Sequence, residues 1–122
     1  MRRCKRWLAT LVLMLVPVLA SAAGWGALLL GGPAQWFNGD DVKLFVDSAR
    51  EALEKAPVGE TVPWRNPKTT NSGATTILAE STKNGLPCKT IKVTTQAKGE
   101  TQSMRYVACH RPDGRWDLTV PQ

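Results

Sequence analysis

A cysteine and a histidine are adjacent at positions 109 and 110, and this pair is the first place where the chain could carry out catalysis. A thiolate next to an imidazole base is the pairing used in nucleophilic catalysis. The two residues fall in a predicted strand, where successive side chains point to opposite faces of the sheet. Cys109 and His110 therefore do not meet, and we predict that the protein is not an enzyme.

A metal centre built from Cys88, Cys109 and His110 is disfavoured for a related reason. The chain has one histidine, and two cysteines joined in a disulfide cannot ligate a metal. We therefore expect neither a metal nor another cofactor.

Trp64 and Trp116 are the candidate binding residues. An exposed tryptophan can stack on a sugar ring or anchor a protein partner. The competing interpretation places both side chains in the core, because a small domain needs large apolar side chains there. Their exposure to solvent distinguishes the two interpretations.

Basic residues recur along the second half of the chain. They could contact acidic lipid headgroups or a cell-wall polymer, or they could be solvated positions that keep strand edges from aggregating. These residues are Lys89, Lys92, Lys98, Arg105 and Arg111.

The N-terminus predicts export from the cytoplasm. A basic cluster in residues 2–6 precedes an uncharged apolar run in residues 7–19 and the small residues 20–23. This order is typical of a secretory signal peptide, which we assign to residues 1–22. An uncleaved anchor is the alternative, because Leu28, Leu29 and Leu30 prolong the apolar character. We expect the protein in the periplasm or at the outer membrane or cell surface.

The charge of the chain gives little support to nucleic-acid binding. The chain has 16 basic and 10 acidic side chains, and four of the basic ones lie in the signal peptide. The remaining 12 basic and 10 acidic side chains give a net charge of +2. Most of the positive excess therefore belongs to the export signal, and we expect no nucleic-acid partner.

Residues 23–39 are predicted to be an irregular linker or tail, followed by one α+β domain in residues 40–122. Trp25, Trp36 and Phe37 suit a membrane interface, so a peripheral membrane contact is one interpretation of this segment. Packing of the segment on the domain is the other.

The domain is predicted to be one amphipathic helix packed on an antiparallel sheet of about five strands. Apolar residues recur every three or four positions from Val42 to Ala56, with Asp40 or Asp41 as N-cap and Pro57 ending the helix. Short β-rich runs separated by turn residues then predict a meander. The predicted strands are 61–65, 74–81, 89–96, 101–110 and 115–120.

One hairpin register satisfies two separate requirements. If Ala97 pairs with Glu100, then Ile91 faces Tyr106 and Cys88 faces Cys109. Cβ atoms at opposite positions are close enough for a disulfide, and an even cysteine pair in an exported chain is most simply oxidised. This register places Ile91, Val93, Met104 and Tyr106 toward the helix, and the disulfide on the other, less covered face.

Several short motifs resemble the outer-membrane surface antigen family of Gram-negative bacteria, of the 17-kDa surface antigen type. They are Trp64-x-Asn66-Pro67, Gly73, Gly85-x-x-Cys88-Lys89 and Cys109-x-Arg111-x-Asp113-Gly114-x-Trp116. The resemblance covers about residues 59–118 and implies an exported envelope protein with a small β-rich domain and no assigned reaction. Many family members carry a glycine-zipper segment and a lipid-bearing cysteine, and this chain lacks both.

The leading hypothesis is therefore a non-enzymatic cell-envelope protein with a structural or binding role, whose partner is another envelope component or protein. A periplasmic inhibitor or assembly module for a protein partner is the first alternative. A cell-wall or carbohydrate binder that uses a tryptophan is the second. A contiguous exposed apolar patch would favour the first alternative.

Overall fold

The computed structural model describes residues 31–120. The predicted signal peptide and Trp25 lie outside the described residues. The elements are the 3-10 helix η1 (Gly32–Trp36), the helix α2 (Gly39–Lys55) and the strands β1 (Thr61–Arg65), β2 (Ser72–Lys83), β3 (Leu86–Ala97), β4 (Glu100–His110) and β5 (Trp116–Thr119).

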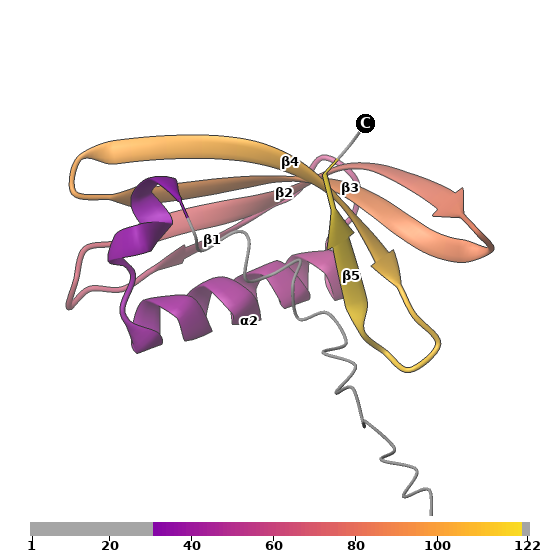
Figure 1. Cartoon of the computed structure of the whole chain (residues 1–122), viewed down its shortest axis with the longest axis horizontal. Coiled ribbons are helices and arrows are strands. Elements are labelled where there is room, and N and C mark those ends of the chain that lie inside the picture. Colours follow the sequence, from indigo (N-terminus) through magenta and orange to yellow (C-terminus); the bar gives the residue numbers. More distant parts are fainter. Residues whose placement is uncertain (1–30, 121–122) are drawn as a thin grey trace, which may run out of the picture.

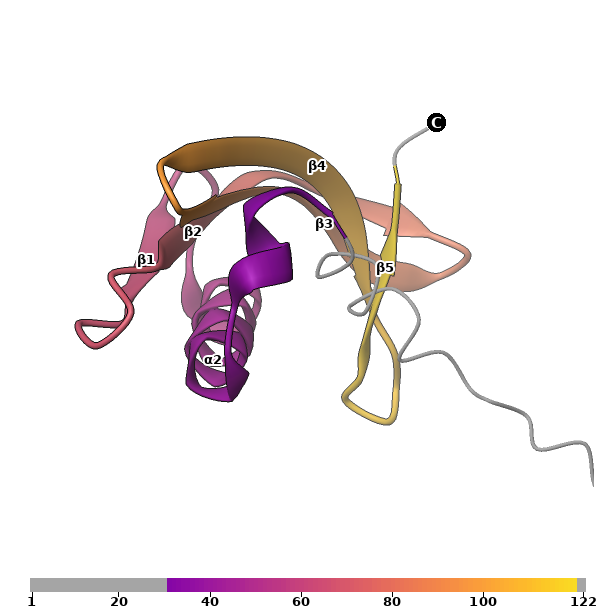
Figure 2. The same ribbon diagram turned by 60° about the vertical axis from the view of Figure 1, so that its left-hand side comes forward.

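The five strands form one antiparallel sheet in the order β1-β2-β3-β4-β5. Each strand pairs with its neighbour in the sequence, so the predicted meander and the predicted α+β fold are confirmed. The sheet arches over α2 and η1, which lie on its concave side, and no described element covers its convex side (Figures 1 and 2). A β-bulge interrupts the pairing of β2 with β3 between Ile77 and Ala79.

The helix starts two residues earlier than the sequence predicts. Asn38, rather than Asp40 or Asp41, is the N-cap. Its side chain accepts a hydrogen bond from the Asp41 amide, and the Asp41 carboxylate accepts one from the Asn38 amide, both at 2.9 Å. This reciprocal pair is a capping box, with Asp41 in the third helical position.

The apolar face of α2 packs into the concave side of the sheet. Phe45 and Leu53 from the helix meet Ile77 and Ile91 from the sheet, and all four are almost fully buried. At its other end, α2 is closed by Lys89, whose Nζ donates to the Leu53 carbonyl at 2.7 Å. A cation at this position satisfies one of the last helical carbonyls and complements the helix dipole.

The β3–β4 register is the predicted one. Ala97 pairs with Glu100, and Cys88 lies directly opposite Cys109. The Lys98-Gly99 turn has positive φ at both residues, as a two-residue type I′ hairpin requires.

One residue of the predicted concave face is not buried. Ile91, Val93 and Tyr106 are in the core, but Met104 is 41% exposed. The reason is that β5 pairs only with Val107–His110 of β4. The preceding half of β4 is an open edge, which leaves Met104 at the margin of the sheet.

Part of the segment before α2 packs on the concave side. η1 contacts β3 and β4, and Lys98 Nζ lies 5.3 Å from the centre of the Trp36 ring. Phe37 makes an edge-on contact with Trp64, with ring centres 5.1 Å apart. Membrane contact through these side chains stays a prediction. Within residues 31–120, no helix is long and apolar enough to cross a membrane.

Candidate functional site

The Trp64-x-Asn66-Pro67 motif belongs to a buried polar cluster around Asp41. The Asp41 carboxylate, whose residue is fully buried, lies against the loop that joins β1 to β2. One oxygen accepts from Asn66 Nδ2 at 2.8 Å and from the Thr69 hydroxyl at 2.7 Å. The other accepts from Asn71 Nδ2 at 2.9 Å, in addition to the Asn38 amide.

These contacts keep Asp41 ionised. Burial by itself raises the pKa of the Asp41 carboxyl, because a low-dielectric environment disfavours charge. The hydrogen bonds from Asn38, Thr69, Asn71 and Asn66 outweigh burial, and the pKa is lowered from its ordinary value. The cluster therefore joins the start of α2 to the β1–β2 loop through an anion with four donors.

Gly73 is required by the position of Trp64. The two residues are direct partners across β1 and β2. A Cβ at position 73 would lie 2.6 Å from the indole nitrogen of Trp64 and 2.5 Å from the Thr94 carbonyl oxygen. Trp64 is only 6% exposed and also meets Phe45 edge-on. Its ring is thus packed in the core and is not presented to a ligand.

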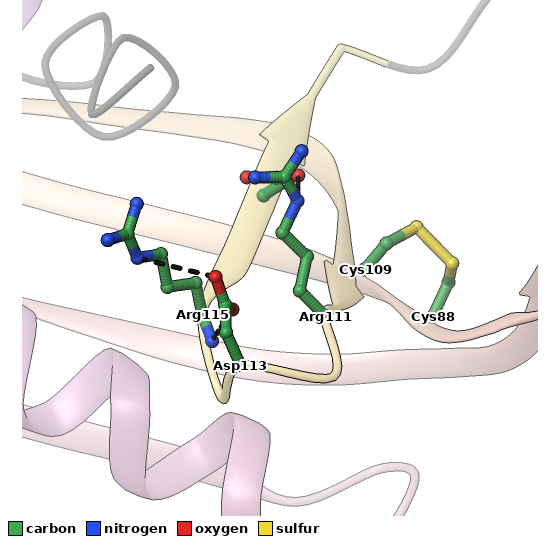
Figure 3. A network of polar contacts seen from close by, with 6 residues as sticks. Cys88, Cys109, Arg111, Asp113 and Arg115 are labelled. Carbon is green, nitrogen blue, oxygen red and sulfur yellow. Dashed lines mark hydrogen bonds and ion pairs between the residues drawn. A yellow bond between two sulfur atoms is a disulfide. The ribbon is translucent and has the colours of Figure 1, made fainter. Parts of the chain in front are cut away.

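The motif that begins at Cys109 and ends at Trp116 forms the end of the sheet near the disulfide. Cys88 and Cys109 are bonded, as predicted, and link β3 to β4 beside the turn that precedes β5 (Figure 3). Across that turn Arg111 forms a 2.6 Å ion pair with Asp117. Asp113 accepts from the Arg115 amide at 3.0 Å, the hydrogen bond of an Asx turn.

The disulfide lies on the convex side. Lys89 reaches α2, so its neighbour Cys88 points the other way. Cys88 is nevertheless only 2% exposed, and Cys109 is half-buried. The convex face as a whole is less covered, as predicted, but neither of the two cysteines on it is exposed.

Trp116 occupies a position between core and surface. It is half-buried, packs against the core cluster and stacks on His110 with ring centres 4.4 Å apart. Its side chain also lines an open hollow of about 430 Å³, together with residues from the far end of the β2–β3 hairpin such as Glu80 and Lys89.

The residues that could do chemistry are not brought together. Cys109 is oxidised, and His110 is stacked on Trp116. Among residues 31–120 there is no group of three His, Cys, Asp or Glu side chains that could hold a metal ion.

The sequence analysis predicted a less covered side of the sheet and basic residues that include Lys92 and Arg105, but not the rows of hydroxyl-bearing side chains that lie beside them. We use "convex face" for the side chains of β1 to β4 that point away from α2. The strand pairing places them in rows, and most carry a hydroxyl, an amide or a positive charge. The rows from the β1 end are Arg65-Ser72-Gln96-Thr101, Pro63-Ala74-Thr94-Ser103 and Thr61-Thr76-Lys92-Arg105. An alternation of Thr, Ser, Lys and Arg every second residue was the available signal.

These features define a small disulfide-linked α+β domain with a buried anionic cluster and an open, polar sheet face. Residues 51–117 match the family model described as 17 kDa outer membrane surface antigen. That match covers more than half of the chain, so the chain belongs to this family, and the resemblance found in the motifs is confirmed.

Named relatives agree with the family match. The chain is 37% identical over 79 residues to the 17 kDa surface antigen of Rickettsia bellii, a stretch that covers 64% of this chain and 50% of the relative. The 17 kDa surface antigens of Rickettsia conorii and Rickettsia prowazekii are 34% and 33% identical over the same shares. The chain thus spans about half the length of these relatives. No solved structure matches it.

Proposed function

We propose that the protein is an exported, non-enzymatic component of the Gram-negative cell envelope that binds another envelope component. The observation that carries this proposal is the Cys88–Cys109 disulfide in a member of a surface antigen family. Disulfides form and persist in oxidising compartments outside the cytoplasm, whereas glutathione and thioredoxin keep cytoplasmic thiols reduced. The signal-like N-terminus supports the same compartment.

A protein partner bound through an apolar patch has less support. The large hydrophobic side chains that are exposed in residues 31–120 are Val58, Met104 and Val120. They belong to three different segments, the loop after α2, the strand β4 and the position that follows β5. Single exposed hydrophobic residues are normal on a soluble surface and do not mark an interface.

Cell fractionation tests the proposal. The chain, with an epitope tag after Gln122, is produced in a Gram-negative host at low level. We expect the tagged protein in the periplasmic fraction released by osmotic shock or in the outer membrane fraction. Recovery with soluble cytoplasmic enzymes would contradict export. A variant with Arg2, Arg3, Lys5 and Arg6 changed to Gln is the control, because it removes the basic end of the predicted signal peptide.

A further inference from the structure

The convex face combines positive charge with a lack of negative charge. Arg65, Lys83, Lys92 and Arg105 point outward from β1 to β4, whereas Glu80 and Glu100 pair with concave-side residues and point to the concave side. The β1–β4 part of this face therefore carries four cations and, among the described residues, no carboxylate. The exposed acidic residues of the helix, such as Asp47 and Glu51, lie on the opposite side of the sheet.

Two of these cations are directly opposite each other. Lys92 and Arg105 are cross-strand partners on β3 and β4, and both are exposed. Like charges at opposite positions of a sheet destabilise it. The salt bridges and hydrogen bonds of residues 31–120 include no partner for either side chain. The fold therefore holds an unfavourable charge pair at the middle of an open face, which an external anion would neutralise.

The neighbours of this pair suit a sugar polymer. Thr76 is the partner of Lys92 on β2, and Thr94 and Ser103 are partners in the adjacent row. The Thr94 and Ser103 hydroxyls lie 2.9 Å apart, and the Thr61 and Thr76 hydroxyls 2.7 Å apart. Side chains of this kind exchange hydrogen bonds with hydroxyl groups as donor and acceptor.

A membrane is a poorer fit to the same face. Stable attachment to lipid needs apolar side chains that enter the acyl boundary in addition to basic residues. The apolar side chains outward on the first three rows are Pro63 and Ala74, and Leu86, the partner of Lys83 at the end of the β2–β3 hairpin, is half-buried. Met104, an exposed large hydrophobic residue, lies on the concave side with its partner Val93.

We infer that the convex face binds a carboxylated polysaccharide, with Lys92 and Arg105 contacting a carboxylate group and the Thr and Ser rows contacting sugar hydroxyls. This inference rests on the proposed function, since it names the chemistry of the envelope component. It requires no bond-making step and no second copy of the chain.

Binding of the purified full chain to alginate, a carboxylated polysaccharide, tests the inference. The test variant is Lys92→Gln/Arg105→Gln. The matched control is Arg50→Gln/Lys55→Gln, which removes the same charge from the exposed side of α2. We expect the wild type and the control to bind alike, the test variant to bind about tenfold more weakly, and neutral dextran not to bind.

Three results would overturn the inference. Equal weakening in the test and control variants would mean that net charge alone attracts the polymer. No binding of the wild type to alginate at about 0.05 M salt, where surface charges are least screened, would exclude the glycan. Loss in the test variant of binding to phosphatidylglycerol vesicles, without loss of alginate binding, would assign the face to lipid instead. The envelope location is tested separately, by fractionation, so none of these three results contradicts it.

Discussion

Asp41 is the residue on which the junction of helix and sheet depends. Replacing Asp41 with Asn would keep the shape but turn one acceptor oxygen into a donor that faces two other donors. We expect Asp41→Asn to lower the free energy of unfolding by about 1–3 kcal/mol, the usual penalty for unsatisfied buried polar groups. Urea unfolding measures this loss.

The control for that change is Asp40→Asn. Asp40 lies in the same helical turn but is exposed, so its replacement removes only a favourable interaction with the helix dipole, worth about 0.3–1 kcal/mol. Equal losses in the two variants would mean that the buried cluster contributes nothing of its own.

The lowered pKa of Asp41 makes stability depend on pH in one direction. The carboxyl has a lower pKa in the folded than in the unfolded chain, where its ordinary value is 3.8. Its contribution is therefore fully present above that value and is lost as the pH falls through the lower, folded pKa. We expect the urea midpoint to fall in this acid range, and to fall less in Asp41→Asn. Parallel pH profiles for the two proteins would contradict this assignment.

Gly73 yields a second residue-scale prediction. In Gly73→Ala the new Cβ overlaps the Thr94 carbonyl oxygen and the Trp64 ring, and overpacking of this kind costs about 1–3 kcal/mol. Gly39→Ala is the control, because a Cβ at the start of α2 meets nothing within 4 Å. Thermal unfolding should separate the two variants clearly. A neutral Gly73→Ala would show that Trp64 is not packed as described.

At the scale of elements, the disulfide links β3 and β4 across a sequence separation of 21 residues. For a closed loop of this length, the chain-entropy model assigns about 3 kcal/mol of stabilisation. We expect Cys88→Ser/Cys109→Ser to lose stability of this order in urea unfolding. Dithiothreitol should destabilise the wild type similarly and leave the double variant unchanged. An unchanged wild type under full reduction would contradict a stabilising role.

The elements also show how far the sequence could predict the structure. The β3–β4 register was predictable because the Lys98-Gly99 turn, the apolar pairs and the two cysteines are local to one hairpin. The N-cap was not, because Asp40, Asp41 and Asn38 are all good caps. Asn38 is selected by Asp41, which is held in turn by donors from Asn66 to Asn71 that are distant in sequence.

Side-chain exposure was the harder part of the prediction. Met104 lies on the predicted side of the sheet, but in the half of β4 that β5 does not reach. The length of β5 therefore decides that Met104 is exposed. Trp64 and Trp116 were equivalent as candidates in the sequence. The structure separates them, because Phe37 and Phe45 enclose Trp64 while Trp116 borders an open hollow.

The whole molecule is a domain with two chemically different sides. The helix side carries mixed charges, and the convex face of β1 to β4 carries cations and hydroxyls. The Lys92→Gln/Arg105→Gln variant removes a like-charge pair, so we expect it to be more stable than wild type by about 0.2–1 kcal/mol. A gain in stability together with a loss of ligand binding is the usual mark of a functional site.

The control variant Arg50→Gln/Lys55→Gln should not gain stability, because Lys55 complements the C-terminal end of the helix dipole. If instead Lys92→Gln/Arg105→Gln is clearly destabilised in guanidinium unfolding, then the two side chains support the sheet, and the argument from charge repulsion is wrong.

The redox state of Cys88 and Cys109 inside living cells decides whether this is an exported domain held by a disulfide. Cells producing a tagged Cys4→Ser chain are quenched in acid and treated with a maleimide–polyethylene glycol reagent before and after reduction. We expect no added mass before reduction and two added groups after it, in protein recovered from the envelope. Two free thiols in unreduced, folded protein would contradict both the disulfide and the exported location.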